Sequence, residues 1–254
     1  EKRLMTTPAL KILSLIDLTS LNDNDNDTAI ATLCEKAKTQ YGLVPAVCIY
    51  SRYIPLARNI LNTAIKIATV TNFPHGSSDI DLALYETQLA IKRGADEVDI
   101  VFPYHYLKNG DSALGWHMVK QAKQICGDKI LKVIIESGEL KSPFLIKQAS
   151  NISIDAGADF IKTSTGKVAV NATLEAAEIM LECIDNSGKK CGFKAAGGIR
   201  TVEEASKYLD LTAKIMGEAW ITPDNFRFGA SSLLGDAINI LNGNINTVER
   251  SNLY

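Results

Sequence analysis

The sequence predicts an α/β protein that folds as a single (β/α)8 TIM barrel with a short N-terminal extension helix. Short apolar runs rich in β-branched residues alternate with longer segments of helical periodicity. Eight such steps, about 32 residues apart on average, fill the 254 residues of the chain, and one such barrel typically takes ~250 residues. No Gly/Ser-rich linker divides the chain. We therefore expect residues 1–254 to form one domain.

The predicted strands and helices follow one another along the chain. The strands are the apolar runs at 15–19, 46–50, 66–71, 97–102, 131–136, 160–164, 191–195 and 226–230. Helical periodicity marks 79–92, 113–126, 143–156 and 173–186, and in the first of these Ile80, Leu84 and Ile91 fall near one face. This alternation indicates parallel βα units. An open doubly wound sheet is the alternative, but the GxGxxG motif that such sheets often carry after a strand does not occur here.

The composition argues against several classes of partner. Lys and Arg number 27 against 29 Asp and Glu, and the net charge of -2 predicts no surface for duplex nucleic acid, although a local basic pocket could hold an anion. No apolar run approaches the ~20 residues that span a membrane. No signal-like apolar core follows the first residues, so we expect a cytoplasmic protein.

The sequence does not predict a metal site. The 5 cysteines lack CxxC spacing and the 3 histidines lack an HExxH motif, which favours reduced thiols. The alternating Asn and Asp residues at 22–27 imitate the first half of an EF-hand loop. Thr28 stands where that loop needs Gly and Cys34 where it needs Glu. We expect instead a solvated loop that ends in an Asp or Thr N-cap.

Charged residues interrupt several of the predicted apolar strands. These are Asp99, Lys132, Glu136, Lys162 and Lys194. Alternate strand residues point into a barrel, so Lys162 and Lys194 both face the interior if the apolar residues before them face the helices. A single strand lysine is usually salt-bridged or extends to solvent. Several ionisable groups converging from four strands favour Schiff-base chemistry, because a lysine beside another cation in a dry pocket loses its proton readily.

Glycine-rich turns follow the last three predicted strands. They are Gly166-Lys167, Gly197-Gly198-Ile199-Arg200 and Gly229-Ala230-Ser231-Ser232. Backbone N–H groups of such turns can approach a phosphate, and serine hydroxyls at a helix start can add to them. Simpler interpretations exist: Gly197-Gly198 can be a turn before a capping box over Thr201–Glu204, and Ser231-Ser232 can be an N-cap. Their positions on adjacent βα loops favour a phosphate site.

Six segments together resemble the deoxyribose-phosphate aldolase family. They are 160–167, 192–200, 97–102, 15–19, 68–76 and 226–232, and they occur in family order over nearly the whole chain. Ala195 is one departure, since many relatives have proline after the lysine. It removes no reactive group.

The resemblance implies a class I aldolase that needs no metal and no cofactor beyond its own lysine. Its reaction would be reversible cleavage of 2-deoxy-D-ribose 5-phosphate to D-glyceraldehyde 3-phosphate and acetaldehyde, in deoxyribonucleotide and deoxyribose catabolism. Lys162 would form the Schiff base, Lys194 would depress the pKa of Lys162, and Asp99 would accept the C3 hydroxyl proton through a water molecule. Lys167 belongs to the phosphate end. The supporting residues would be Asp17, Lys132, Thr165 and the C-terminal Tyr254.

Other functions remain open at this point. A second Schiff-base barrel, such as a transaldolase-like enzyme, would use a different sugar phosphate. A non-catalytic sugar-phosphate binding protein would be expected to lack the reactive lysine, whereas Lys162 and Lys194 are both present. The partners we expect are a small phosphorylated sugar and short aldehydes, with a homodimer possible. Cys48 is expected to be a packed thiol.

Overall fold

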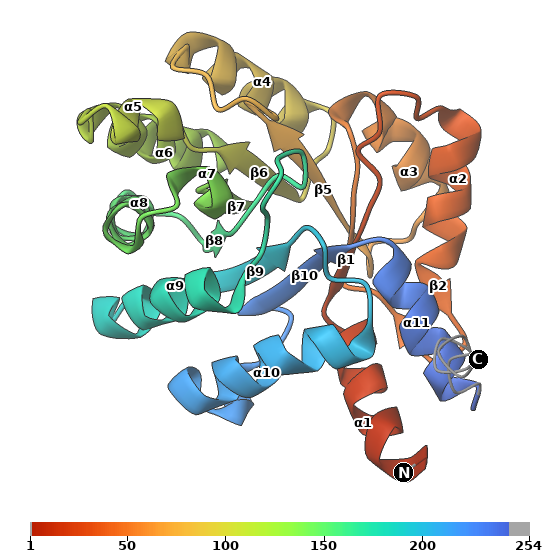
Figure 1. The fold of residues 1–254 in the computed structure, drawn as a ribbon. Coiled ribbons are helices and arrows are strands. Elements are labelled where there is room, and N and C mark those ends of the chain that lie inside the picture. Colours follow the sequence, from red (N-terminus) through yellow and green to blue (C-terminus); the bar gives the residue numbers. More distant parts are fainter. Residues whose placement is uncertain (1, 244–254) are drawn as a thin grey trace.

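Parallel strands close into a barrel at the centre of the molecule (Figure 1). The structure is a computed structural model, and it describes residues 2–243, with side chains from residue 7 onward. Within these residues eight strands close in the order β1-β10-β9-β8-β7-β6-β5-β4. They are β1 (Ile16–Thr19), β4 (Ala46–Cys48), β5 (Lys66–Thr71), β6 (Glu97–Val101), β7 (Ile130–Ile134), β8 (Phe160–Lys162), β9 (Gly192–Ala196) and β10 (Phe226–Ala230). The predicted (β/α)8 barrel is confirmed.

Helices surround the barrel and cover the outer face of its strands (Figure 1). They are α2 (Asp27–Lys36), α3 (Ile54–Ile60), α4 (Ile80–Lys92), α6 (Ala113–Cys126), α8 (Pro143–Asp155), α9 (Leu174–Ser187), α10 (Val202–Met216) and α11 (Ser232–Leu241). The expected extension helix is α1 (Lys2–Leu13), which packs against α10 and α11.

The alternation of side chains along the strands separates an apolar outer layer from a charged interior. Ile161 and Phe193 are fully buried in the apolar core between strands and helices. Their neighbours Lys162 and Lys194 are partners in the parallel β8–β9 register and point into the barrel. The predicted inward orientation of both lysines is therefore correct.

Side-chain caps begin the helices that follow the strands. Asp79, Ser142 and Thr173 each accept a hydrogen bond from the backbone N–H three residues on, at the starts of α4, α8 and α9. Thr201 and Glu204 form a complete capping box at α10. These caps explain why the helix starts follow the sequence pattern closely.

The loop at 22–27 differs from the expectation in its capping residue. The N-cap of α2 is Asn26, whose side chain accepts from Ala29 N, and not an Asp or Thr. Asp25 instead turns back into the loop, where both of its carboxylate oxygens accept from Ser20 Oγ at 2.8 and 2.9 Å. The aspartate is used to close the loop, and the neighbouring amide caps the helix.

Several short elements were not predicted. They are the antiparallel pair β2 (Lys38–Thr39) and β3 (Gly42–Leu43), and the short helices η1 (Ser51–Tyr53), α5 (Tyr104–Lys108), α7 (Ser137–Leu140) and η2 (Glu218–Trp220). The strand predicted at 131–136 ends earlier than expected. β7 ends at Ile134, because Glu136 adopts a left-handed conformation with φ 55° and leads into α7. All 5 cysteines are buried and unpaired. None of the helices within residues 2–243 combines the length and the hydropathy of a membrane-spanning segment.

Candidate active site

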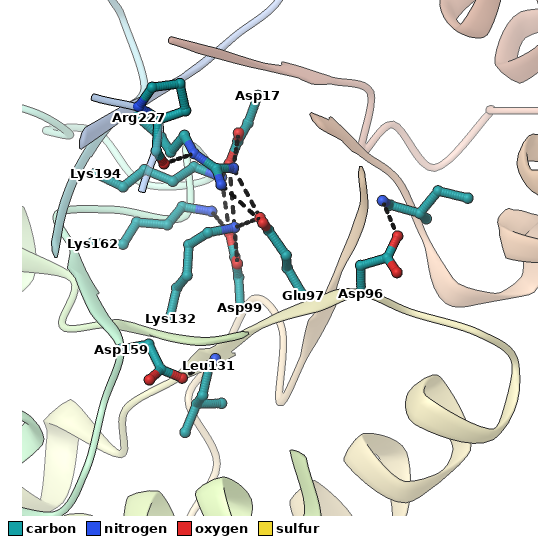
Figure 2. A network of polar contacts seen from close by, with 12 residues as sticks. Asp17, Asp96, Glu97, Asp99, Leu131, Lys132, Asp159, Lys162, Lys194 and Arg227 are labelled. Carbon is teal, nitrogen blue, oxygen red and sulfur yellow. Dashed lines mark hydrogen bonds and ion pairs between the residues drawn. The ribbon is translucent and has the colours of Figure 1, made fainter. Parts of the chain in front are cut away.

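Seven charged side chains meet in the barrel interior and form the charge network shown in Figure 2. They come from six strands and all are at most 4% exposed. The charge network consists of Asp17, Glu97, Asp99, Lys132, Lys162, Lys194 and Arg227. Burial of a charge is costly unless it is paired, so the distribution of contacts within this network decides the state of each group.

Asp99 contacts all three lysines. Its Oδ2 atom accepts from Lys162 Nζ at 3.0 Å and from Lys194 Nζ at 2.9 Å, and its Oδ1 accepts from Lys132 Nζ at 2.9 Å. Burial alone would raise the pKa of Asp99, but the three ammonium groups hold it well below its ordinary value. Asp99 is therefore a carboxylate that orients the three amines.

Asp17 and Glu97 connect the lysines to Arg227. Asp17 Oδ2 lies 2.7 Å from Lys194 Nζ and 3.2 Å from Lys132 Nζ, and its Oδ1 accepts from Arg227 Nη1 at 2.8 Å. Glu97 accepts two hydrogen bonds from the guanidinium of Arg227, each 2.9 Å long, and lies 2.7 Å from Lys132 Nζ. Every charged group in the network thus has at least one partner of opposite sign.

The three lysines differ in the direction of their pKa shifts. Burial lowers the pKa of each, but Asp17 and Asp99 reverse this effect for Lys194 and, with Glu97, for Lys132, so both end above their ordinary values. Lys162 is different. Burial lowers its pKa, Asp99 only partly opposes this, and Lys194 lowers it further, leaving a net decrease. Lys162 is the amine of the network that gives up its proton most readily.

A pocket of about 230 Å³ opens above Lys162 at the carboxyl ends of the strands. Lys162 is the member of the charge network that lines it, whereas Lys194 and Asp99 lie fully buried beneath. The remaining predicted binding residues line the same pocket: Thr165, Gly166, Lys167, Gly197, Gly198, Arg200, Gly229, Ser231 and Ser232. Residues that are distant in the sequence thus meet beside one amine.

The turns of this pocket have the backbone geometry that their glycines permit. Gly197 and Gly198 have φ of 89° and 83°. A Cβ on Gly197 would lie 2.5 Å from Cβ of Asn171, whose side-chain oxygen accepts from Gly166 N at 3.0 Å. The loops after β8 and β9 are therefore packed directly against each other through Asn171.

Ser231 and Ser232 lie at the start of α11 with their side chains exposed. Ser231 is the N-cap residue but makes no side-chain capping bond. The helix start therefore keeps backbone donors that an anion can use. The interpretation of this serine as a capping side chain is not supported by its geometry.

Glu136 holds Thr165 in place through two hydrogen bonds. Glu136 accepts from Thr165 N at 3.0 Å and from Thr165 Oγ1 at 2.7 Å. Burial raises the pKa of Glu136, and the bonds from Thr165 oppose that rise. Thr165 Oγ1 in turn accepts from Lys167 N at 3.0 Å, so this arrangement shapes the loop that carries Gly166 and Lys167.

Some residues of the site were not predicted, and one prediction cannot be located. Thr19, Leu21, Asn22, Ala196, Ile199 and Ala230 also line the pocket, and Glu97 and Arg227 belong to the charge network. The sequence does mark Arg227 as unusual, because it is a charged residue between Phe226 and Phe228 in an apolar strand. Tyr254 lies outside the described residues.

The arrangement suits covalent chemistry on a small anionic carbonyl compound. A buried amine with a lowered pKa is a nucleophile, and the glycine and serine loops beside it offer anion-binding donors. Within residues 2–243, no three His, Cys, Asp or Glu side chains are arranged so that they could hold a metal ion.

Comparison with known proteins supports this interpretation of the fold and chemistry. Residues 11–236 match the model of a family described as DeoC/LacD family aldolase. A protein of Coccidioides immitis, provisionally described as a deoxyribose-phosphate aldolase, is 29% identical with a TM-score of 0.81, over 92% of this chain and 86% of that chain.

Two further solved structures share the fold. One from Toxoplasma gondii ME49, with the same provisional description, has a TM-score of 0.86 at 23% identity, over 98% of this chain and 99% of that chain. The deoxyribose phosphate aldolase of Aeropyrum pernix, described as tetrameric, has a TM-score of 0.71 at 23% identity, over 95% and 97% of the two chains.

Proposed function

The chain belongs to the DeoC/LacD aldolase family, and we propose that it is a class I aldolase that reversibly cleaves 2-deoxy-D-ribose 5-phosphate to D-glyceraldehyde 3-phosphate and acetaldehyde. The single observation that carries this proposal is Lys162. It is a buried lysine with a lowered pKa, and it lines a pocket whose other walls are glycine and serine loops. In this proposal residues 1–254 act as one cytoplasmic lyase domain that needs no metal.

The first step is attack of the neutral Lys162 amine on the C1 aldehyde of the open-chain sugar. The carbinolamine loses water to give a protonated iminium, which accepts the electron pair of the C2–C3 bond as that bond breaks. The C3 hydroxyl loses its proton as it becomes the aldehyde of glyceraldehyde 3-phosphate. The remaining enamine is protonated at carbon and hydrolysed, releasing acetaldehyde and the Lys162 amine.

Asp99 and Lys194 act beneath the reacting amine. Asp99 does not line the pocket, so the proton of the C3 hydroxyl would reach it through a water molecule. Lys194 stays charged because its ammonium contacts Asp17 and Asp99, and its charge disfavours protonation of Lys162. Lys132 and Asp17 hold these groups in position.

The substrate phosphate would occupy the end of the pocket formed by the turns after β8, β9 and β10. The side chains of Lys167 and Arg200 supply positive charge there, and Gly197, Gly198 and the start of α11 supply backbone donors. Loops after the last strands of such barrels are a frequent phosphate site, which supports this placement.

The proposal is tested by reductive trapping. Acetaldehyde and borohydride are added to the protein, and the modified peptide is located by mass mapping. We expect one ethylated lysine, Lys162, and cleavage of 2-deoxy-D-ribose 5-phosphate by the untreated enzyme. An adduct at another lysine, or no adduct, would overturn the mechanism. Trapping without cleavage of this sugar would point to a different sugar phosphate.

A further inference from the structure

Arg227 and Glu97 lie at the end of the charge network away from the pocket that contains Lys162. Both line a separate cavity of about 680 Å³ at the amino ends of the strands, which the first residues of β5, β7, β8 and β9 also line. Neither residue lines the pocket above Lys162. Arg227 and Glu97 therefore do not contact a substrate that is bound at Lys162.

The charge network holds four cationic side chains and three carboxylates. If all seven were charged, one positive charge would be uncompensated in a dry interior, which is unfavourable. A guanidinium keeps its proton in proteins, and Arg227 is held by Asp17 and by two bonds to Glu97. Charge balance therefore favours loss of a proton from one of the three lysines.

The contacts single out the lysine that loses it. Lys132 contacts three carboxylates and Lys194 contacts two, whereas Lys162 contacts one. Loss of the proton from Lys162 therefore breaks the fewest ion pairs, and it leaves three cations and three carboxylates in the network.

We propose that Arg227 and Glu97 are positioning residues that set the protonation state of Lys162 through the charge balance of the network. Arg227 supplies the positive charge that makes a neutral Lys162 the balanced state, and Glu97 limits this effect by pairing with Arg227 and Lys132. The proposal rests on the proposed Schiff-base role of Lys162.

Other charged groups near Lys162 do not provide this balance. Asp17, Asp99, Lys132 and Lys194 are members of the network already counted, and the inward residues Ala68 and Val70 of β5 are apolar. Cys48 on β4 faces the network as a buried thiol, whose raised pKa keeps it neutral. Glu136, beyond the end of β7, is held by Thr165 and lies too far from Lys162 for an ion pair; the charge of Lys162 lowers the pKa of Glu136, but burial outweighs this and leaves it raised, so Glu136 is the weakest anion near Lys162.

The test measures how the rate of reductive ethylation at Lys162 by acetaldehyde and cyanoborohydride depends on pH. Only the neutral amine attacks, so the rate rises with pH through the pKa of Lys162. Four variants are compared with the parent protein: R227Q, E97Q, the double variant R227Q/E97Q, and R227K. R58Q is the matched control, because Arg58 pairs with Asp96, which makes no ion pair with a member of the network.

The signs of the expected shifts follow from the charge removed. R227Q removes a cation, so the midpoint should move up by about one pH unit and the rate on its acidic side should fall about tenfold. E97Q removes an anion, so the midpoint should move down by a similar amount. R227Q/E97Q restores the original balance, and R227K and R58Q retain the charge of the network. All three should therefore keep a midpoint near that of the parent.

A purely structural role would not produce opposite shifts. Equal midpoints in the parent protein, R227Q and E97Q, with trapping still at Lys162, would overturn this inference and leave the proposed function intact. Failure of the parent protein to trap at Lys162 would instead overturn the proposed function. Folding of each variant is checked by circular dichroism, and if R227Q does not fold, the direction of the E97Q shift decides the question.

Discussion

Lys162 differs from the other two lysines of the barrel in what surrounds its amine. Its Nζ contacts one carboxylate, that of Asp99, and it lines the pocket. Lys132 is enclosed by carboxylates and lies 5.9 Å from the ring centroid of Phe160. Both lysines are buried, so burial alone does not make a nucleophile. The number of paired anions separates the lysine with a lowered pKa from the two whose pKa values are raised.

The first prediction concerns replacement of Lys162. K162A should lower kcat for sugar cleavage by at least about 10³-fold, because among the described residues the other lysine that lines the pocket is Lys167, which lies in the turn beyond β8 and outside the charge network. The rate is measured with 2-deoxy-D-ribose 5-phosphate as substrate. Ordinary activity in K162A would contradict the mechanism.

K167A is the matched control for K162A. Lys167 is exposed and lies in the turn after β8, on the pocket wall. Its loss should raise KM for the phosphorylated sugar, by about tenfold if the ammonium binds the phosphate, and should leave trapping of acetaldehyde at Lys162 in place. Loss of trapping in K167A would mean that Lys167 has been assigned the wrong role.

Single residues were predictable where a charge breaks an apolar strand. Lys162, Lys194 and Asp99 gave this signal, and the structure brings the three together. Arg227 gave the same signal between two phenylalanines but was overlooked, and Glu97 is the first residue of its strand, where a charge is unremarkable. Which charges pair with one another depends on the register between neighbouring strands. The alternation of residues along a single strand does not reveal that register.

At the scale of elements, the site depends on three loops that leave adjacent strands. The loops after β8 and β9 are packed together where Asn171 meets Gly197, and the loop after β10 runs into α11. G197A should therefore disturb the predicted phosphate end without touching Lys162. Its Cβ would lie 2.5 Å from that of Asn171 at a φ of 89°, which costs about 1–3 kcal/mol of stability.

The expected result for G197A is a raised KM for the phosphorylated sugar with little change in acetaldehyde trapping. G235A is the control, because Gly235 lies within α11 and, among the described residues, no atom outside the helix backbone lies within 4 Å of the added methyl group. Replacement of a helical glycine by alanine is neutral or stabilising. If both variants behave as the parent protein does, the contact between the two loops does not shape the site.

The capping box of α10 gives a prediction about stability. Thr201 Oγ1 accepts from Glu204 N at 3.1 Å, and Glu204 Oε2 accepts from Thr201 N at 3.3 Å. T201A should lower the free energy of unfolding by about 1 kcal/mol, measured by urea denaturation. T201S keeps the hydroxyl and should restore most of the loss. Equal losses in T201A and T201S would show that the methyl group, not the cap, carries the effect.

Long elements were more predictable than short ones. The bounds of α6 match the predicted 113–126 because its apolar period runs over several turns and Gly127 ends it. The pair β2–β3 and the helix α7 span only a few residues each, too few for periodicity to emerge. They are stabilised by contacts with distant segments, such as the bond from Lys38 Nζ to the carbonyl of Ile60.

At the scale of the whole molecule, barrel closure assembles the charge network. β1 pairs with β10, and the ion pair between Asp17 and Arg227 joins residues separated by 210 positions. The eight-step pattern predicted closure, but the depth at which each inward side chain sits follows from the register of neighbouring strands. This is why the cluster around Lys162 was expected, whereas the connection to Glu97 and Arg227 was not.

The last prediction is that acid destabilises the protein through this network. The pKa of Asp17 and that of Asp99 lie well below the ordinary value of 3.8, because Lys132 and Lys194 outweigh the effect of burial on both carboxyls. In the unfolded chain both groups take up protons near pH 3.8, while the folded protein does not. Their stabilising contribution is therefore complete above that pH and is lost progressively as the pH falls below it.

Urea unfolding between pH 7 and pH 2.5 measures this contribution, and D17N tests its source. D17N should lower the free energy of unfolding at pH 7 by about 3–5 kcal/mol, because it leaves Lys194 and Arg227 with one carboxylate partner fewer in the interior. The same variant should lose less stability than the parent protein on acidification, since one of the two titrating groups is gone. D155N is the control: Asp155 pairs with Lys189 at the surface, and its loss should change little at either pH. Parallel acid profiles for the parent protein and D17N would place the acid sensitivity outside the barrel interior.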